Sequence, residues 1–174
     1  SRGYLESIVL YREIAKRLPF YDAFVFHGAA LEYDGSAYLF TARSGVGKTT
    51  HLHLWQKRYG DKVDIVNGDK PLVRRAEDGR FLAYGTPFCG KEGWQENTSV
   101  PLTALLFLER GDTDEIAPLT PEEAFPLLYA AILPPKDKAG LHLLLPLLSE
   151  LLAHTRLYRV RCTPQLSAAA LSYR

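Results

Sequence analysis

Sulfur is scarce in this sequence, which has no methionine and only two cysteines, Cys89 and Cys162, among 174 residues. The two cysteines do not form a CxxC pair, and no histidine stands beside them at the spacing of a zinc site. We therefore expect neither a disulfide framework nor a zinc site. A chain without structural disulfides is typical of a reducing compartment, so the expected location is the cytoplasm.

An excess of charge of one sign and long hydrophobic runs are also missing. The 21 Lys and Arg residues nearly balance the 20 Asp and Glu residues, which leaves a net charge of +1. That balance provides no attraction for nucleic acid or for an anionic membrane. The longest apolar run, residues 140–153, contains a histidine, a proline, a serine and a glutamate and is too short to span a bilayer. Residues 1–18 scatter charges among apolar positions, unlike a signal peptide. We expect neither nucleic acid nor a membrane as a partner.

What remains is an ordinary globular composition, with 47% hydrophobic and 24% charged residues, and we expect one domain over residues 1–174. Apolar spacings of three and four residues predict helices, and short apolar or alternating runs between turn residues predict strands. The expected helices are 4–18, 48–59, 121–133, 141–153 and 167–173, and the expected strands are 23–33, 37–42, 63–66, 71–76, 80–87, 102–110, 115–119 and 157–162. Asp34-Gly35 predicts a hairpin turn, and Thr120 with Glu123 predicts a capping box. Together these elements predict an α/β fold with a mixed sheet that contains hairpins and is flanked by helices.

The most specific motif is SGVGKTT at residues 44–50, between an expected strand and an expected helix. In such a P-loop, glycines let successive backbone N–H groups point at phosphate oxygens, and the following helix adds its positive N-terminal dipole. Lys48 is expected to reach the β- and γ-phosphates, and the Thr49 hydroxyl to bind Mg²⁺. Ala42 replaces the usual first glycine, the smallest departure available. The alternative is a tight strand-to-helix turn with a solvated lysine. The expected nucleotide-binding residues are Arg43, Ser44, Gly45, Val46, Gly47, Lys48, Thr49 and Thr50.

The residues around this motif carry a family resemblance. The segment HGAALEYDGSAYLFTARSGVGKTT, residues 27–50, resembles the superfamily of HPr kinase/phosphorylase and ATP-dependent phosphoenolpyruvate carboxykinase. In that superfamily a histidine-glycine pair, here His27-Gly28, precedes a hairpin that leads into the P-loop. The similarity extends over residues 24–73, with a weaker likeness over 84–102 to small kinase-like proteins of the group. The resemblance implies a P-loop domain of this type, with ATP and Mg²⁺ as cofactors and a phosphate acceptor as second substrate.

The resemblance also implies a pair of aspartates after the P-loop helix, one for the metal and one as base toward an acceptor hydroxyl. The matching residues here are Gly68 and Asp69, in the segment VDIVNGDKPLV. Asp69 is therefore expected to bind Mg²⁺, directly or through water. The alternative is that NGDKP is only a polar turn. Gly68 cannot move a proton, so the base must come from another residue, or the protein is not a hydroxyl kinase of the expected kind.

His27 is the first candidate for that base. The resemblance implies a place near the γ-phosphate, and an imidazole takes up and releases protons near neutral pH. The alternative is a core histidine satisfied by its neighbours. Lys91, in the expected loop 88–100, is a candidate for neutralising a transferring phosphoryl group, or else a solvated loop charge. Glu32 is a second candidate base, and Trp94 is expected to pack against the nucleotide base or the core.

Two functions are consistent with these residues. The first is an ATP- and Mg²⁺-dependent kinase that transfers the γ-phosphate to a hydroxyl of a small molecule or of a serine in a peptide or protein. Such transfer depends mainly on positioning and charge neutralisation, and its expected catalytic residues are His27, Lys48, Asp69 and Lys91. The second is a nucleotide-binding sensor or accessory protein with little or no transfer, because Gly68 occupies the position of the base.

Overall fold

The computed structural model of the chain describes residues 2–42 and 46–172, with the side chains of 5–42 and 46–172. Its helices are α1 (Arg2–Arg17), α2 (Lys48–Tyr59), α3 (Pro121–Ala130), α4 (Lys138–His154) and α5 (Leu166–Leu171), with the short 3-10 helices η1 (Leu18–Tyr21) and η2 (Gly60–Lys62). Its strands are β1 (Ala23–Val25), β2 (Ala29–Tyr33), β3 (Ser36–Thr41), β4 (Val63–Asn67), β5 (Leu72–Arg75), β6 (Phe81–Tyr84), β7 (Ser99–Arg110), β8 (Glu115–Pro118) and β9 (Arg156–Cys162).

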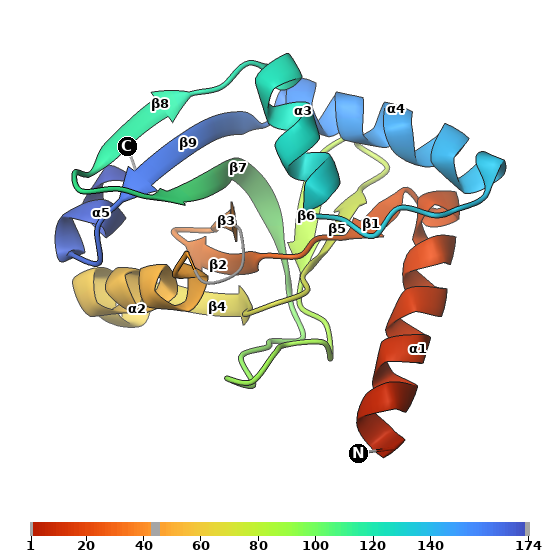
Figure 1. Cartoon of the computed structure of the whole chain (residues 1–174), viewed down its shortest axis with the longest axis horizontal. Helices are drawn as coiled ribbons and strands as arrows, with labels where there is room; N and C mark the ends of the chain where they lie inside the picture. Colours follow the sequence, from red (N-terminus) through yellow and green to blue (C-terminus); the bar gives the residue numbers. More distant parts are fainter. Residues whose placement is uncertain (1, 43–45, 173–174) are drawn as a thin grey trace.

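The strands form one mixed sheet flanked by helices, which confirms the fold class predicted from the sequence (Figure 1). Its main path runs in the order β1-β5-β6-β7-β3-β2-β4, and β9 joins the second part of β7, with β8 outside it. The pairs β3–β7 and β7–β9 are parallel, and the remaining pairs are antiparallel. The carboxyl ends of β3, β7 and β9 therefore meet at one edge of the sheet, where open α/β sheets usually bind ligands.

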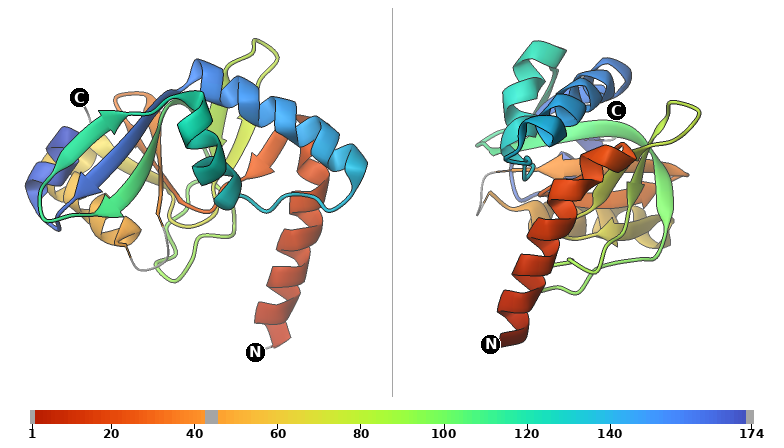
Figure 2. Two further views of the ribbon diagram at one scale, coloured as in Figure 1. Left: turned by 45° about the horizontal axis from the view of Figure 1, so that its top comes forward. Right: turned by 90° about the vertical axis from the view of Figure 1, so that its right-hand side faces the viewer.

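Helices cover both faces of this sheet, α3 and α4 on one face and α2 with α5 on the other (Figures 1 and 2). The central strands supply both cores because successive side chains point to opposite faces. Leu39 and Leu105 belong to the cluster under α4, whereas the next residues, Phe40 and Leu106, belong to the cluster over α2. Burial on both faces explains why the sequences of β3 and β7 are nearly continuous runs of apolar residues.

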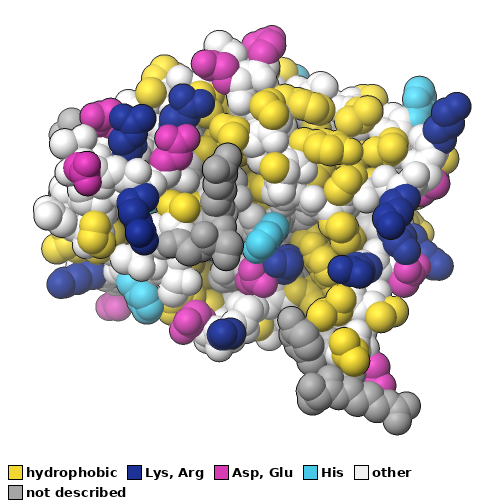
Figure 3. Space-filling model, in the orientation of Figure 1, with side chains coloured by type: hydrophobic (Ala, Val, Ile, Leu, Met, Phe, Trp, Pro, Cys, Tyr) yellow, Lys and Arg dark blue, Asp and Glu magenta, His cyan; other side chains and the backbone are white. Residues whose placement is uncertain are grey.

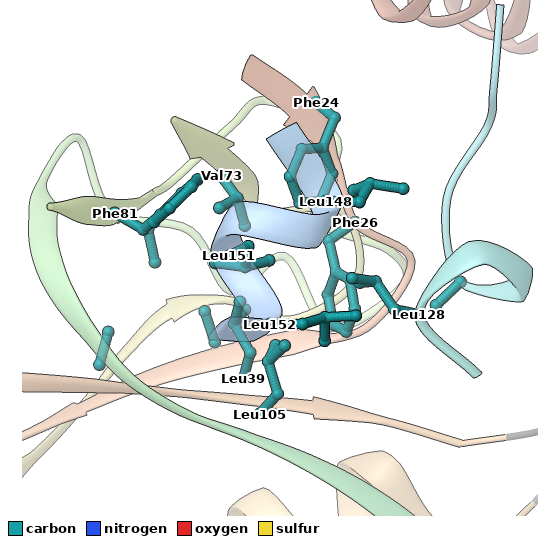
Figure 4. Close-up of a cluster of buried hydrophobic side chains, with 14 of the residues drawn as sticks. Phe24, Phe26, Leu39, Val73, Phe81, Leu105, Leu128, Leu148, Leu151 and Leu152 are labelled. Atoms are coloured by element: carbon teal, nitrogen blue, oxygen red, sulfur yellow. The ribbon is translucent and has the colours of Figure 1, made fainter. Parts of the chain in front are cut away.

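The cluster under α4 joins the two parts of the sheet (Figure 4). Phe24 from β1 and Val73 from β5 meet Leu148 and Leu151 from α4 there, and all four side chains are at most 3% exposed. Burial of such side chains supplies most of the favourable free energy of folding. The α4 helix therefore packs against both the β1–β5–β6 part of the sheet and the strands β3 and β7, and it holds the two parts together.

The first helix lies apart from these layers. It extends away from the sheet with the N-terminus at its far end (Figures 1 and 2), and Leu5, Val9 and Leu10 are 58–65% exposed. Hydrophobic side chains also gather on the surface over α3 and α4 (Figure 3). Within residues 2–42 and 46–172, no helix has both the length and the apolar character required to cross a membrane.

The structure corrects the expected strand 23–33, which is divided into β1 and β2 by residues 26–28. Gly28 explains the break, because a Cβ at this position would lie 2.3 Å from the Phe40 carbonyl oxygen and 2.3 Å from a ring carbon of Phe26. Its N–H donates to the Asp69 carbonyl oxygen over 3.0 Å instead of to a strand partner. The chain thus leaves its pairing with β5 and enters the pairing with β3 and β4.

Other boundaries differ less from those expected. The expected loop 88–100 ends two residues earlier, because β7 begins at Ser99 and pairs there with β6. The fourth helix begins at Lys138 rather than 141, because the Asp137 side chain accepts a hydrogen bond from the Gly140 N–H and caps it. The capping box of Thr120 with Glu123 is confirmed, and so is the two-residue turn that joins β2 to β3.

Two leucines of α4 test the contribution of the buried cluster. Leu148 is fully buried, whereas Leu145, one turn earlier on the same helix, is 39% exposed. Leu148→Ala is expected to lower the free energy of unfolding by about 2–5 kcal/mol, because it removes buried methyl groups and leaves a cavity. Leu145→Ala is expected to change it by less than about 1 kcal/mol. Denaturant titration measures both, and equal effects of the two variants would contradict this account of the core.

Candidate functional site

The connection between β3 and α2, residues 42–47, contains the glycine-rich motif. We refer to it as the β3–α2 loop; its predicted nucleotide-binding residues Arg43, Ser44 and Gly45 lie outside the described residues. Gly47 caps α2 with φ of +112°, a conformation that glycine adopts readily and that L side chains rarely adopt. Glycine also has no side chain to accept hydrogen bonds from the first N–H groups of the helix. The start of α2 therefore has the backbone arrangement that binds anions in other proteins.

The first turn of α2 presents Lys48, Thr49 and Thr50. The Lys48 side chain is partly buried, and both threonines are exposed. Burial lowers the pKa of Lys48 from its usual value and Lys70 lowers it further, while the nearby Asp69 carboxylate opposes the shift. The charges of Lys48, Lys70 and Asp69 are thus close enough to influence one another, and they meet beside the start of a helix.

Asp69 is held in place by a side chain that sequence reasoning did not single out. The Asn67 side chain is fully buried, and its Oδ1 accepts hydrogen bonds from the backbone N–H groups of Asp69 (3.0 Å) and Lys70 (2.7 Å). Its Nδ2 donates to the Thr86 carbonyl oxygen over 2.9 Å, and the Thr86 hydroxyl donates to the Lys70 carbonyl oxygen over 2.7 Å. The segment NGDK is therefore a turn, as its composition suggests, but a turn with a fixed backbone that directs Asp69 outward.

Two side chains, His27 and Lys70, contact different oxygens of the Asp69 carboxylate. His27 Nε2 lies 3.4 Å from Oδ1, and Lys70 Nζ lies 3.1 Å from Oδ2. Burial by itself would raise the pKa of Asp69, but the hydrogen bond from His27 and the charge of Lys70 outweigh it, so the pKa lies below its usual value. The carboxylate is consequently ionised at neutral pH and remains about one third exposed, so it is accessible to a ligand.

His27 is a surface residue and not a core histidine. Its side chain is 53% exposed, although the neighbouring Phe26 and Gly28 are buried. The backbone of His27 is held on both sides. Its backbone N–H donates to the Ala131 carbonyl oxygen at the end of α3 over 2.6 Å, and its carbonyl oxygen accepts from the Thr41 hydroxyl over 3.0 Å. These bonds connect His27 to the end of β3, immediately before the β3–α2 loop.

The space beside Gly68 is occupied. A Cβ at Gly68 would lie 3.3 Å from the Cys89 carbonyl oxygen and 3.4 Å from the Trp94 Cβ, and the Gly68 N–H donates to the Trp94 carbonyl oxygen over 2.9 Å. A side chain at this position would therefore be in tight contact with the loop that carries Cys89 and Trp94. Positions 68 and 69 therefore offer one carboxylate, Asp69, where the family resemblance implies two.

The remaining predicted residues lie at different distances from the cluster of His27, Asp69 and Lys70. Lys91 is exposed and follows Gly90, where an added Cβ would lie 3.1 Å from the Asp69 Cβ, so Lys91 stands beside the cluster. Trp94 packs against the ring of His53, with the centroids 4.8 Å apart. Glu32 pairs with Ala37 at the start of β3, which is the end of that strand away from the β3–α2 loop.

The structure adds Lys70 and Tyr11 to the site. The Lys70 ammonium lies 5.9 Å from the centre of the Tyr11 ring, which itself contacts the Phe88 ring at 5.2 Å between centroids. Burial and the charge of Asp69 both raise the pKa of Tyr11. Lys70 adjoins Asp69 in the sequence and could have been proposed from that position. Tyr11 comes from α1, and no local pattern connects it with the motif.

Two cavities adjoin the β3–α2 loop, and Val46 lines both. The first has a volume of about 600 Å³ and lies between His27, the ends of β3 and β7, and α3, so we name it the α3 cavity. The second has a volume of about 350 Å³ and lies between the start of α2 and the residues at the ends of β7 and β9, so we name it the α2 cavity. The lining of the α3 cavity is mostly apolar apart from His27, Thr41, Glu109 and Arg110.

Hard oxygen donors are present for a magnesium ion that binds together with phosphate. Among residues 5–42 and 46–172, no group of three or more His, Cys, Asp and Glu side chains is arranged to hold a metal ion. Mg²⁺ is commonly bound by one or two protein oxygens, with phosphate and water completing an octahedron. The ionised Asp69 carboxylate and the exposed Thr49 hydroxyl fit that smaller requirement.

Comparisons with known proteins identify a family and show a likeness in fold to solved structures. A family model described as "SynChlorMet cassette protein ScmC" matches residues 4–132, well over half of the chain. No curated protein matches the sequence. Among solved structures, the HPr(Ser) kinase/phosphatase from Coxiella burnetii is similar, with 9% sequence identity, a TM-score of 0.47, and coverage of 86% of this chain and 93% of that chain.

The contact between His27 and Asp69 predicts that the pKa of Asp69 changes when His27 is replaced. In His27→Ala the pKa of Asp69 is expected to rise, because the hydrogen bond that favours its ionised form is lost. With a folded-state pKa below the unfolded value, Asp69 stabilises the fold above the unfolded pKa, and this contribution is lost as pH falls through the folded pKa. A titration of the carboxyl carbon by NMR measures the shift. His53→Ala, which removes an exposed histidine from α2, is the matched control, and equal shifts in both variants would exclude the contact.

Proposed function

The chain belongs to the family of SynChlorMet cassette proteins called ScmC, and we propose that it acts as an ATP- and Mg²⁺-dependent kinase that phosphorylates a hydroxyl group. The observation that carries the proposal is that Lys48, at the start of α2, lies close enough to the ionised Asp69 carboxylate for the two charges to influence each other, and that Gly47 caps this helix without a side-chain hydrogen bond. A cation and a helix N-terminus suit phosphate, and a carboxylate beside them suits its metal ion. The resemblance of residues 24–73 to HPr kinases and carboxykinases supports the same interpretation, with the chain acting as one P-loop unit.

In this proposal the start of α2 binds the phosphates of ATP. The N–H groups that follow Gly47 donate to phosphate oxygens, and Lys48 contacts the β- and γ-phosphates. Its partial burial strengthens the attraction, because water screens the charge less there. Arg43, Ser44, Gly45, Val46 and Thr50 are the further residues proposed to bind phosphate.

Asp69 and the Thr49 hydroxyl hold Mg²⁺ in this proposal. When bound, the ion neutralises charge on the phosphate oxygens. Lys70, 3.1 Å from the carboxylate, keeps Asp69 ionised when the metal is absent. Lys91, on the exposed turn beside Asp69, is the further cation that neutralises charge on the transferring group.

His27 is the proposed base, because Gly68 leaves no second carboxylate for that role. In the tautomer with the proton on Nε2, the nitrogen 3.4 Å from Asp69 Oδ1, the ring has its lone pair on Nδ1, and this atom takes the proton of the acceptor hydroxyl. The acceptor oxygen then forms a bond to the γ-phosphorus, the bond from that phosphorus to the β-γ bridging oxygen breaks, and ADP leaves with the bridging electrons. The acceptor, a small molecule or a peptide or protein serine, reaches His27 through the α3 cavity.

A second candidate function is a nucleotide-binding sensor or accessory protein with little or no transfer. The observation in its favour is Gly68 itself, which provides no second carboxylate and contacts Cys89 and Trp94 closely. In this case Lys48 and Asp69 still bind Mg²⁺ and ATP, but no group removes the acceptor proton efficiently.

A binding and transfer assay tests these functions through Lys48. In Lys48→Ala the affinity for Mg²⁺-ATP is expected to fall by about 10- to 100-fold, because a charge-assisted contact to phosphate is lost. Lys57→Ala, which removes an exposed lysine from the last turn of the same helix, is the matched control and is expected to bind like the wild type. Calorimetric titration measures the affinity, and γ-labelled ATP with peptide and small hydroxyl acceptors measures transfer. Unchanged ATP binding by Lys48→Ala would refute the nucleotide site, and tight binding without transfer to any acceptor would favour the sensor.

The proposed base is tested separately. His27→Ala is expected to lower the rate of transfer to the labelled acceptor by about 10²- to 10⁴-fold, the usual contribution of a general base. Its affinity for Mg²⁺-ATP is expected to stay within about threefold of the wild type, since His27 is assigned to the acceptor side. The His53→Ala variant serves as the control. Transfer at the wild-type rate by His27→Ala would remove His27 from the mechanism.

A further inference from the structure

The proposed transfer step uses the α3 cavity and leaves the α2 cavity unassigned. Gly47, Thr50 and His51 line the α2 cavity from the start of α2, while Arg110 and Thr163 line it at the ends of β7 and β9. These strands are parallel neighbours, so the cavity lies where open α/β sheets bind ligands. Its volume of about 350 Å³ falls within the range of small-molecule sites, roughly 300–1,000 Å³.

We propose that the α2 cavity binds the base and ribose of a nucleoside triphosphate whose phosphates lie across the start of α2. The proposal rests on the proposed function, because it takes Lys48 and Thr49 as residues that bind phosphate. Asp69 and His27 mark the end at which the terminal phosphate lies, and His27 lines the α3 cavity. A triphosphate is a linear chain, so its nucleoside leaves at the opposite end. That direction leads past Thr50 into the α2 cavity.

The lining of the α2 cavity suits an uncharged aromatic base with an attached sugar. Leu54 and Pro164 provide apolar surface against which a base can pack. The exposed carboxylate of Asp112 is an acceptor for ribose hydroxyls or for an exocyclic amine of the base. Ligand sites commonly combine such apolar walls with a few polar groups that fix orientation.

A buried nitrogen without a partner adds an independent observation. The His51 side chain lines the α2 cavity and is 2% exposed, and its Nδ1 has no hydrogen-bond partner in the part of the chain that the structure describes. The other ring nitrogen, Nε2, is occupied, at 3.1 Å from Ser172 Oγ and 3.3 Å from Trp55 Nε1. An unpaired buried polar atom destabilises a protein, so a ligand atom that pairs with His51 Nδ1 gains affinity.

Two matched substitutions distinguish the cavities. Leu54 lines the α2 cavity and Leu127 lines the α3 cavity, and both are partly buried leucines on helices. Leu54→Trp fills the α2 cavity and is expected to weaken Mg²⁺-ATP binding by at least about tenfold, with inorganic tripolyphosphate binding within about twofold of the wild type. Leu127→Trp is expected to leave both affinities unchanged. Calorimetric titration of the full chain measures them, with circular dichroism as the check on folding.

The outcomes separate this inference from the function on which it rests. If Leu54→Trp binds ATP as well as the wild type, or if Leu127→Trp is the variant that loses ATP, the nucleoside assignment is overturned and the kinase proposal stands. If the wild-type protein binds neither ATP nor tripolyphosphate, both are overturned.

Loss of both ligands by Leu54→Trp would indicate a disturbed β3–α2 loop, and labelling of the wild-type protein then decides. Cys162 lines the α2 cavity, whereas Cys89 lies beside Gly68 on the Asp69 side and serves as the internal reference. Saturating Mg²⁺-ATP is expected to slow modification of Cys162 by a thiol reagent severalfold more than tripolyphosphate does. Equal modification of Cys162 in the presence of the two ligands overturns the proposal.

Discussion

The hydrogen bond from the Gly28 N–H to the Asp69 carbonyl oxygen, 3.0 Å long, joins two turns that are distant in the sequence. It forms only because residue 28 has no Cβ, since the Phe40 carbonyl oxygen and the Phe26 ring occupy that space. The same bond marks the point at which the chain passes from β1 to β2, and it brings the exposed His27 ring to the Asp69 carboxylate. The bond from Thr41 to the His27 carbonyl oxygen then connects this contact to the β3–α2 loop. The candidate site depends on this one close approach of two backbones.

The polar groups around Asp69 show how a fixed carboxylate is built from a short turn. Asn67 is fully buried, and its oxygen and nitrogen both have hydrogen-bond partners, so its burial is compensated and the turn is rigid. Asp69 itself is only partly buried and remains ionised through His27 and Lys70. Because residue 68 is glycine, this turn has one carboxylate. In the proposed kinase, His27 therefore takes the acceptor proton in place of a second carboxylate.

Helices on both faces of the sheet make two different cavities available at one edge. The central strand β7 is parallel to both β3 and β9, so three strand ends reach that edge together. One face carries α3 and the mostly apolar cavity that contains His27. The other carries α2 and α5, with His51, Trp55 and Ser172 buried between them. In the proposed kinase these faces divide the substrates, the acceptor on the α3 side and the nucleoside on the α2 side, with Lys48 between them.

Local patterns in the sequence determined most of the elements and their class. The apolar runs of β3 and β7, the Asp-Gly turn, the capping box at Thr120 and the glycine-rich motif before α2 each act over a few residues, so they are visible without the fold. Tertiary structure decided which side chains meet. It divided the expected strand 23–33 at Gly28, turned His27 toward solvent and to Asp69, placed Tyr11 beside Lys70, and packed Cys89 and Trp94 against Gly68. Those contacts join residues far apart in the chain and depend on space left by neighbouring backbones, a property that no short segment of the sequence carries.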